Sequence, residues 1–499
     1  MSGEEGEIAA WLARRSDRVI ETSCARVFLS GDRALKLKKR IDLGFLDFRT
    51  LAQRRSAIER ELAFNRPNAP DIYLATHAVT RGPDGGFALD GEGLAVDYAL
   101  EMRRFDEGAV LAARPQTVDG DLGEALGRLI ARAQAAAPMR DDAGGTAALG
   151  YTVASNAEVL EGLSAELGAE AVAALVQRTQ AEFERQSPLL EARKAAGFGR
   201  RCHADLHLGN ILLEDGRPVL FDCIEFNDRL SDIDVQYDVA FLLMDLAFRN
   251  CEAAAARALS GWLDESARLF GPAVFGGLGA LPLMLSVRAA VRAHVSVNSG
   301  EQDAGRAYLA AALAHLDPRP PVLAAVGGLS GVGKSVFARE IAPRLGAPPG
   351  AVILRSDEIR KRLAGAGPLD RLPAQAYGPD ADERVYAAMF EAARGVLAGG
   401  WPVVLDATFL DPDLRKRASA LAAEVGAGFE GVWLTAPAAV LARRIGGRRG
   451  DASDATSATL AAQQTRNIGP LEWLELTTEG GSAAAAQAWA SRRAPGRAK

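Results

Sequence analysis

The spacing of apolar residues predicts two halves that are built differently. In the first half, short alternating runs indicate strands, and longer segments with helical spacing follow them. Continuous apolar runs that alternate with helices appear only later in the chain. The strands expected in the first half lie at 25–38, as a hairpin turning at Ser30-Gly31-Asp32, at 71–79 and at 94–104, and the expected helices lie at 50–65, about 121–136, about 156–196 and from 228 to about 316.

The pattern changes at the segment Asp317-Pro-Arg-Pro-Pro321, where three prolines stop the preceding helix. Val322–Val326 then begins an alternation of strands and helices that is typical of a parallel sheet. The residues after 478 are rich in Ala, Gly and Arg without an apolar period, so we expect them to be disordered. The predicted organisation is a domain over 1–316, a linker over 317–321, a domain over 322–478 and a tail over 479–499.

A glycine-rich segment, GLSGVGKS at 328–335, follows the strand 322–326 directly and precedes a helix. Strand, GxxxxGKS and helix in this order form a phosphate-binding loop, whose backbone N–H groups converge on phosphate oxygens at a helix N-terminus. A chance glycine-rich turn is disfavoured because only 8 of the chain's 58 basic residues are lysines. The residues expected to bind ATP are Gly328, Ser330, Gly331, Gly333, Lys334, which reaches the phosphates, and Ser335, whose hydroxyl ligates Mg²⁺.

Two further predicted strands end in acids beside this loop. The strand 351–355 leads into Asp357 and Arg360, and the strand 402–405 ends at Asp406, which is suited to hold Mg²⁺ or its water. In open parallel sheets, ligands bind at the carboxyl ends of the strands. The arginines of 443–449 either close over the phosphates or form a solvated helix face.

With these motifs, residues 320–478 resemble the small P-loop kinases of the zeta-toxin, polynucleotide-kinase and gluconate-kinase type. The resemblance implies that Asp357 is the base that deprotonates the acceptor hydroxyl and that Arg360 contacts the acceptor. It also implies that Arg444 and Arg448 are lid arginines that stabilise the transition state.

A second phosphotransfer signature lies in the first domain, as His203-Ala-Asp205-Leu-His207-Leu-Gly-Asn210 followed by a turn and Asp222. An Asp five residues before an Asn in a tight loop sets a base at the acceptor hydroxyl and an amide oxygen at Mg²⁺, and the hairpin returns Asp222 to the same metal. The two histidines also have the spacing of a zinc pair. The glutamate of HExxH is absent, however, and the following Leu-Gly favours a loop.

This arrangement is that of protein-kinase-like folds and, with His207, resembles the aminoglycoside phosphotransferase family. The resemblance implies that Asp205 is the catalytic base, that Asn210 and Asp222 are metal ligands, and that His203 supports the loop. Three later acids either brace the catalytic loop or cap helices, namely Asp232, Asp234 and Asp238.

A kinase lobe also needs a strand lysine paired with a helical glutamate to bind the ATP phosphates. Lys36, on the second arm of the hairpin, and Glu61, on the next helix, are the expected pair. Glu59 and Lys38 are alternatives, because residues two apart on a strand share a face. No GxGxxG precedes Lys36, which disfavours a protein substrate.

Composition narrows the class of protein. With 48% hydrophobic and 24% charged residues the chain is globular, and its four cysteines form no CxxC pair, so we expect a reducing, cytoplasmic compartment. Residues 1–318 carry a net charge of −11 and residues 319–499 a net charge of +5, so the first domain would repel nucleic acid. The uncharged stretch 269–287 is long enough to tempt a membrane assignment, but its prolines and glycines favour buried helices, and we expect no membrane partner.

The whole chain resembles the bifunctional aminoglycoside-phosphotransferase-like and P-loop ATP-binding proteins of bacteria. This implies an α+β, protein-kinase-like bilobal module followed by an α/β P-loop kinase module with a parallel sheet. We expect a tandem kinase that uses ATP and Mg²⁺ to phosphorylate hydroxyls of sugar-like or aminoglycoside-like small molecules, with one site per module. Two alternatives stay open: only one module is catalytic and the other senses nucleotide, or the second module phosphorylates 5′-hydroxyl ends of nucleic acid.

Overall fold

The computed structural model describes residues 3–42, 46–447 and 450–493, and its chain divides into two compact units. The division does not follow the linker at 317–321, because several helices of the first predicted domain belong to the same unit as the P-loop domain. Unit 1 comprises Met1–Thr117, Ala137–Leu149 and Gly199–Asp238, and unit 2 comprises Val118–Ala136, Gly150–Phe198 and Val239–Lys499.

Unit 1 contains a six-stranded antiparallel sheet in the order β1-β2-β3-β6-β4-β5. The predicted hairpin is confirmed as β2 and β3, with Val27 opposite Lys36, and the two further predicted strands are β4 and β6. The elements are α1 (Gly3–Ala13), β1 (Arg18–Glu21), β2 (Ala25–Ser30), β3 (Arg33–Lys38), α2 (Leu51–Asn65), β4 (Tyr73–Arg81), β5 (Phe87–Leu89) and β6 (Leu94–Arg103).

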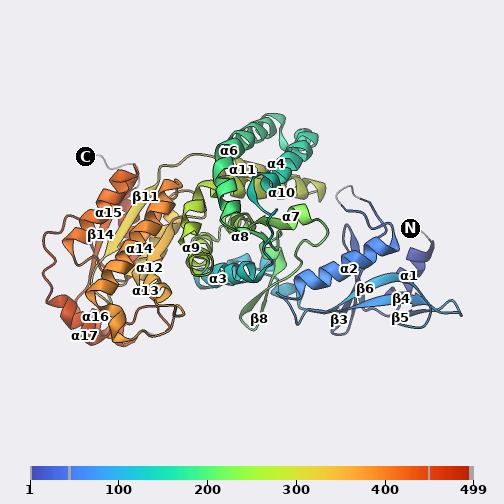
Figure 1. The fold of residues 1–499 in the computed structure, drawn as a ribbon, viewed down its shortest axis with the longest axis horizontal. Helices are drawn as coiled ribbons and strands as arrows, with labels where there is room; N and C mark the ends of the chain where they lie inside the picture. The colour runs from blue at the N-terminus through green and yellow to red at the C-terminus, as the bar shows by residue number, and fades with distance from the viewer. Residues whose placement is uncertain (1–2, 43–45, 448–449, 494–499) are drawn as a thin grey trace. The chain divides into compact units, whose positions relative to one another are not determined.

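Helix α2 lies along this sheet and begins with a capping box (Figure 1). The Thr50 hydroxyl accepts from the Gln53 N–H at 3.2 Å, and the Gln53 side chain accepts from the Thr50 N–H at 2.9 Å. Such a box satisfies backbone donors that the first helical turn leaves without partners. The face that α2 turns to the sheet carries Glu61, which is fully buried.

The second part of unit 1 is a set of short strands and turns that carries the HxDxxxxN motif. β8 and β9 form an antiparallel hairpin directly after the motif, and β10 pairs with β7. These elements are β7 (Gly199–Arg201), η4 (Leu208–Asn210), β8 (Ile211–Glu214), β9 (Arg217–Leu220), α7 (Asp228–Ser231) and β10 (Asp232–Asp234).

Long helices make up the first part of unit 2. The single helix expected at 156–196 is wrong, because the chain breaks around Leu163 and again at Gly168, whose φ of +98° only glycine adopts readily. The helices are α3 (Gly120–Ala136), α4 (Gly145–Gly162), α5 (Ser164–Leu167), α6 (Ala169–Ala195), α8 (Val235–Phe248), α9 (Glu252–Leu269), α10 (Leu281–Asn298) and α11 (Gln302–His315), where α4 and α8 begin in ranges of unit 1.

The second part of unit 2 is a five-stranded parallel sheet in the order β12-β13-β11-β14-β15, with helices around it (Figure 1). The predicted βα alternation after Val322 is therefore confirmed. The strands are β11 (Val322–Gly327), β12 (Val352–Arg355), β13 (Val403–Asp406), β14 (Gly428–Thr435) and β15 (Leu474–Thr477), and the helices are α12 (Lys334–Ile341), α13 (Ser356–Leu363), α14 (Pro379–Ala398), α15 (Pro412–Glu424), α16 (Ala438–Gly446), α17 (Ser457–Gln464) and α18 (Ser482–Arg493).

Helix α9 joins the two parts of unit 2. Its Ala256 is fully buried in the same apolar cluster as Ile353 of β12, and the Ile353 N–H donates to the Ser260 hydroxyl at 3.0 Å. Helix α3 crosses α9 closely, because a Cβ at Gly127 would lie 2.1 Å from the Ala258 carbonyl oxygen. The helical layer thus packs on an edge strand of the P-loop sheet, which explains why the compact units differ from the predicted domains.

One helical stretch in the described residues, Pro272–Asn298, is long and apolar enough to cross a membrane, and 78% of its most apolar window is buried. It consists of the 3₁₀ segment η5 (Pro272–Ala280) and helix α10. The burial favours the prediction of core helices over that of a membrane span.

The expectation of a disordered tail is wrong for residues 482–493, which form α18. Trp489 is 2% exposed, packs edge-on against Phe337 at 6.5 Å between ring centroids, and donates from Nε1 to Glu430 at 3.1 Å. The apolar face of α18 consists mainly of alanines, whose small side chains give a weak hydrophobic period, so the sequence pattern missed it. Residues 494–499 lie outside the described residues.

Replacing Trp489 with alanine should lower the free energy of unfolding by about 3–5 kcal/mol, because it leaves a cavity beside Phe337. Urea denaturation of the full chain measures this loss. Gln487→Ala, at an exposed position on the same helix, is the matched control and should change the free energy by less than about 0.5 kcal/mol. Equal stability of the two variants would contradict the packing described for α18.

Candidate active sites

The first site is organised around the Lys36 ammonium, which lies 2.6 Å from Glu61 Oε1 and 3.4 Å from Asp222 Oδ1. Strand β3 supplies the lysine, α2 the glutamate and the segment after β9 the aspartate. The predicted pair of Lys36 and Glu61 is therefore brought together, and Asp222 joins it. Of the alternatives, Glu59 pairs instead with Arg55 on the exposed face of α2.

Lys38 is not a rival of Lys36 but a second cation on the same glutamate. Its ammonium lies 2.7 Å from Glu61 Oε2 and 2.7 Å from Glu225 Oε1, and its side chain is 2% exposed. Glu225 stands three residues after Asp222, so this ion pair ties the segment of the predicted metal ligand to strand β3. The sequence analysis did not identify Glu225, because a lone glutamate after the motif carries no local signal.

Buried charges set the ionisation of this cluster. Burial opposes the ionised form of Glu61, but the ammonium groups of Lys36 and Lys38 outweigh it and lower the pKa of Glu61 to about 2. Burial and the nearby Glu61 raise the pKa of Glu225, although Lys38 favours its ionised form. The pKa of Lys36 is raised because Asp222 and Glu61 outweigh its burial.

The predicted base of the first site, Asp205, is oriented by Asn210. The Asn210 amide nitrogen donates to Asp205 Oδ2 at 2.8 Å and to the Asp205 carbonyl oxygen at 3.0 Å. Asn210 thereby turns its amide oxygen away from Asp205, and an amide oxygen is a ligand type that Mg²⁺ accepts. The Asp205 side chain is one-third exposed, so a hydroxyl could approach it.

Both ring nitrogens of His203 are within hydrogen-bond distance of backbone groups at the loop of the HxDxxxxN motif. One ring nitrogen, Nε2, lies 2.8 Å from the Phe221 carbonyl oxygen, and the other, Nδ1, accepts from the Asp205 N–H at 3.3 Å. Burial lowers the pKa of His203, which agrees with a neutral ring that donates at Nε2 and accepts at Nδ1.

Two of the three later acids brace the same loop. Asp238 accepts from the Ala204 N–H at 2.7 Å and holds Ala204 at a φ of +69°, a conformation that a residue with a Cβ rarely adopts. Asp232 forms a two-pronged ion pair with Arg201 at 2.6 and 2.7 Å. Asp234 instead accepts from the Gln236 N–H at 2.7 Å, as a helix cap does.

The contacts of His207 disfavour a zinc site at the two histidines. His207 Nδ1 accepts from the Gly209 N–H at 3.0 Å, as in a turn. Within residues 3–42, 46–447 and 450–493, no group of three or more His, Cys, Asp or Glu side chains is placed to hold a metal ion. Mg²⁺ on a nucleotide differs, because phosphate oxygens and waters complete its shell and one or two protein ligands suffice.

In the second site, the glycines of the loop after β11 are required by geometry. Gly328, Gly331 and Gly333 have φ values of +138°, +84° and +93°. A Cβ would lie 2.6 Å from the Leu434 carbonyl oxygen at Gly328 and 2.3 Å from the Ser482 hydroxyl at Gly333. The loop therefore has the strand, glycine and helix arrangement that binds phosphate at the N-terminus of α12.

Lys334 and Ser335 begin α12 at the end of this loop. The Lys334 ammonium donates to the carbonyl oxygens of Gly328 and Leu329 at 3.0 and 3.1 Å, so it lies across the loop that would hold the phosphates. The Ser330 N–H, one of the loop donors, points to the Gln463 amide oxygen of α17 at 2.8 Å.

Arg355, which the sequence analysis missed, is at the centre of the second site. It ends β12 directly beside Asp406 of β13, and its guanidinium lies 3.3 Å from Asp406, 3.1 Å from Ser335 Oγ and 2.9 Å from Asp451. The predicted metal ligands Ser335 and Asp406 thus share one buried cation. An arginine at a strand end two residues before the predicted base was the available signal.

Asp357 and Arg360 lie on the first turns of α13, beyond Arg355. Burial raises the pKa of Asp357, as does Asp406, while Arg355 and a hydrogen bond from Ser453 favour its ionised form. Arg360 donates to the Ala376 carbonyl oxygen and to Asp382, both at 2.7 Å. Its role as an acceptor contact stays a prediction.

Of the two predicted lid arginines, the structure describes only Arg444. Arg444 donates to the carbonyl oxygens of Thr478 and Val332 at 2.7 and 3.3 Å, which makes it a support of the phosphate loop in this structure. Its role as a lid arginine that stabilises the transition state stays a prediction. Arg448 lies outside the described residues.

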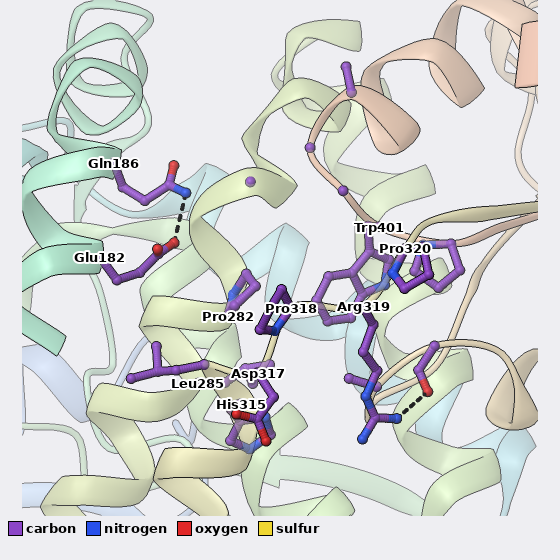
Figure 2. Close-up of a pocket in the computed structure, with 18 of the residues that line it drawn as sticks. Glu182, Gln186, Pro282, Leu285, His315, Asp317, Pro318, Arg319, Pro320 and Trp401 are labelled. Carbon is purple, nitrogen blue, oxygen red and sulfur yellow. Dashed lines mark hydrogen bonds between the residues drawn. The ribbon is translucent and has the colours of Figure 1, made fainter. Parts of the chain in front are cut away.

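Unit 2 also contains a cavity of about 770 Å³ (Figure 2). α6, η5, the linker and the loop around Trp401 line it, and none of the predicted site residues does so. Two polar contacts lie within its lining: Gln186 donates to Glu182 at 2.9 Å, and Arg319 donates to the Gly346 carbonyl oxygen at 3.0 Å.

Comparison with known proteins supports the division into two modules. Residues 57–275 match the family model described as "Phosphotransferase enzyme family", and residues 323–469 match the model described as "AAA domain". Uncharacterized proteins of Mycobacterium tuberculosis and Mycobacterium bovis are 33% identical to this chain over 466 residues, which cover 89% of this chain and 90% of each relative. The chain belongs to the same family as these mycobacterial proteins.

This chain therefore combines an aminoglycoside-phosphotransferase-like module with a P-loop kinase-type module, and both predicted resemblances are confirmed. Among solved structures, a gluconokinase from Sinorhizobium meliloti is 23% identical, covering 34% of this chain and 90% of that chain with a TM-score of 0.25. An ethanolamine kinase from Plasmodium vivax is 11% identical, covering 59% of this chain and 81% of that chain with a TM-score of 0.38.

Replacing Lys38 with methionine should lower the free energy of unfolding by about 3–5 kcal/mol, because it leaves Glu225 and Glu61 buried with one cation fewer. Adding Glu225→Gln should restore part of this loss, and urea denaturation measures both variants. Lys39→Met is the matched control, since Lys39 pairs with the exposed Glu21 and should cost at most about 1 kcal/mol. A Lys38 variant as stable as the control would show that the buried cluster does not hold this site together.

Proposed function

We propose that the chain is a tandem kinase that transfers the γ-phosphate of ATP to hydroxyls of small molecules, with one site in each module. The observation that carries the proposal is that each unit contains a lysine suited to bind phosphate and an aspartate suited to act as a base. Lys36 and Asp205 form the set in unit 1, and Lys334 and Asp357 form the set in unit 2. The family models, which describe a phosphotransferase and a P-loop module, support the same conclusion.

In the first site, Lys36 would hold the phosphates while Glu61 fixes its ammonium. Asn210 and Asp222 offer oxygen ligands for Mg²⁺, which when bound would neutralise charge on the transferring phosphoryl group. Asp205, held by Asn210, would accept the proton of the acceptor hydroxyl as the new P–O bond forms and the bond from the γ-phosphorus to the bridging oxygen breaks, which releases ADP. Positioning and charge stabilisation do most of the work in such a reaction.

In the second site, the N–H groups of the loop 328–335 would surround the phosphates and Lys334 would leave its carbonyl contacts to reach them. Ser335 and Asp406 offer the oxygen ligands for Mg²⁺. Asp357 accepts the proton of the second acceptor, and its raised pKa makes it a better base than a solvated aspartate.

The acceptors we propose are neutral or cationic alcohols of the sugar or aminoglycoside type. The net charge of −11 over residues 1–318 would disfavour an anionic acceptor at the first site. The names of the similar solved structures, a gluconokinase and an ethanolamine kinase, agree with small hydroxyl acceptors. We also propose that the enzyme is cytoplasmic, acts on soluble small molecules and needs no membrane or nucleic acid.

Single substitutions of the two bases should silence the two sites independently. Asp205→Asn should lower the rate of ADP release with acceptors of the first site at least about 100-fold, and Asp357→Asn should do the same with acceptors of the second site. Each base assists proton transfer only in the transition state of its own site. Steady-state ADP release, measured over a panel of sugar, aminoglycoside and amino-alcohol acceptors, tests this. If neither substitution lowers turnover with any acceptor, the tandem-kinase proposal fails. If only one does, the sensor alternative for the other module replaces it.

The pH dependence of the second site should report the raised pKa of Asp357. In the Asp205→Asn background, kcat/KM should fall as pH drops through that pKa, above the ordinary value of 3.8, because only the ionised carboxylate accepts a proton. Ser453→Ala removes a hydrogen bond that favours the ionised form, so the acidic limb should move to higher pH. An unchanged limb in the Ser453 variant would contradict Asp357 as the base.

A further inference from the structure

One carboxylate oxygen in unit 2 lies between two guanidinium groups from distant parts of the chain. Glu358 Oε1 is 3.1 Å from Arg355 Nη1 and 3.5 Å from Arg128 Nη2. Arg355 stands at the phosphate side of the P-loop sheet, whereas Arg128 comes from α3, within the phosphotransferase-family match. All three side chains are at most 10% exposed, so water screens these charges little.

Arg128 is itself held firmly by the helical layer. Its guanidinium lies 2.8 Å from Asp264 of α9 and 3.2 Å from Glu124 of α3. Asp264 also pairs with Arg362 of α13, the helix that carries the predicted base Asp357. Two ion-pair connections thus run from α3 and α9 to α13, one through Glu358 and one through Asp264.

The other side of Arg355 faces the groups that would bind Mg²⁺. It donates to Ser335 Oγ at 3.1 Å and pairs with Asp406 at 3.3 Å and Asp451 at 2.9 Å. The Arg355 guanidinium therefore has four acceptor side chains, namely Glu358, Ser335, Asp406 and Asp451. Glu358 and Asp406 attract this guanidinium in opposite directions. The strength of the Glu358 contact sets how closely Arg355 approaches the predicted metal ligands.

We propose that Arg128, a residue of the phosphotransferase module, is a positioning residue of the P-loop site, where it sets the affinity for nucleotide-bound Mg²⁺ through Glu358 and Arg355. Without Arg128, Glu358 keeps a single cation in a buried site and takes up a proton more readily. Arg355 then loses an anionic partner on one side and moves toward Asp406, where it competes with the metal. The inference rests on the proposed function of the second site as a site for ATP and Mg²⁺.

The test uses the full chain with Asp222→Asn, which removes a metal ligand of the first site. Calorimetric titration with ATP at a series of Mg²⁺ concentrations then reports the P-loop site. Arg128→Met should raise the Mg²⁺ concentration for half-maximal ATP binding about tenfold, and ATP binding in EDTA should stay unchanged. Arg128→Lys should restore part of the Mg²⁺ affinity, because it returns the charge without the two-pronged geometry.

Two further variants complete the test, a second perturbation of the same ion pairs and a matched control. Glu358→Gln removes the anion between the two guanidiniums without removing a buried cation, and it should shift the Mg²⁺ dependence in the same direction even if Arg128→Met fails to fold. Arg132→Met, one turn along α3 at a half-exposed position, should leave that dependence unchanged. If the Arg128 and Glu358 variants fold and their ATP binding depends on Mg²⁺ as that of the parent chain does, the inference is overturned while the proposed function stands. A parent chain that shows no Mg²⁺-dependent ATP binding would instead overturn the proposed function of the second site.

Discussion

Compensation of buried charge is the constraint on which both sites depend. A charged side chain removed from water is tolerated only beside partners of opposite sign. In unit 1 the ammonium groups of Lys36 and Lys38 are compensated by Glu61 and Glu225, and in unit 2 the guanidinium of Arg355 is compensated by Asp406, Asp451 and Glu358. Each cluster fixes side chains from several elements in one arrangement. The predicted base of the first site, Asp205, stays more exposed at the edge of its cluster, where an acceptor can reach it.

The same constraint links the helical layer to the P-loop sheet. Packing brings α9 onto β12 through Ala256 and the hydrogen bond from Ile353 to Ser260, and the ion pairs of Arg128 follow at the border of this contact. The helices that complete the phosphotransferase module are therefore also part of the surroundings of the second site.

Sequence reasoning identified the parts of the sites that depend on local chemistry. The phosphate loop was predictable because Gly328 and Gly333 occupy backbone conformations and close contacts that only glycine tolerates. The tight loop that holds both Asp205 and Asn210 was predictable from their spacing in the motif, whereas the hydrogen bond between them is seen only in the structure. The hairpin of β2 and β3 followed from its alternation, which also placed Lys36 and Lys38 on one face.

What sequence reasoning missed depends on contacts between residues far apart in the chain. Glu225 acquires its role only when the fold brings it to Lys38, and Glu358 only when it meets Arg128. The contacts of Arg444 with the carbonyl oxygens of Thr478 and Val332 likewise join residues far apart in the chain, and its lid role stays a prediction. The disorder expected for residues 482–493 was wrong because one buried tryptophan, Trp489, anchors an alanine-rich helix that has little hydrophobic period of its own.

The central claim is that each module binds its own ATP, and the stoichiometry of nucleotide binding tests it most directly. Equilibrium titration of the full chain with ATP and Mg²⁺ should give two nucleotides per chain. Lys36→Met should remove one of them and Lys334→Ala the other, each leaving the remaining site intact. A stoichiometry of one in the unmodified chain, or the loss of both nucleotides with either single substitution, would contradict the account.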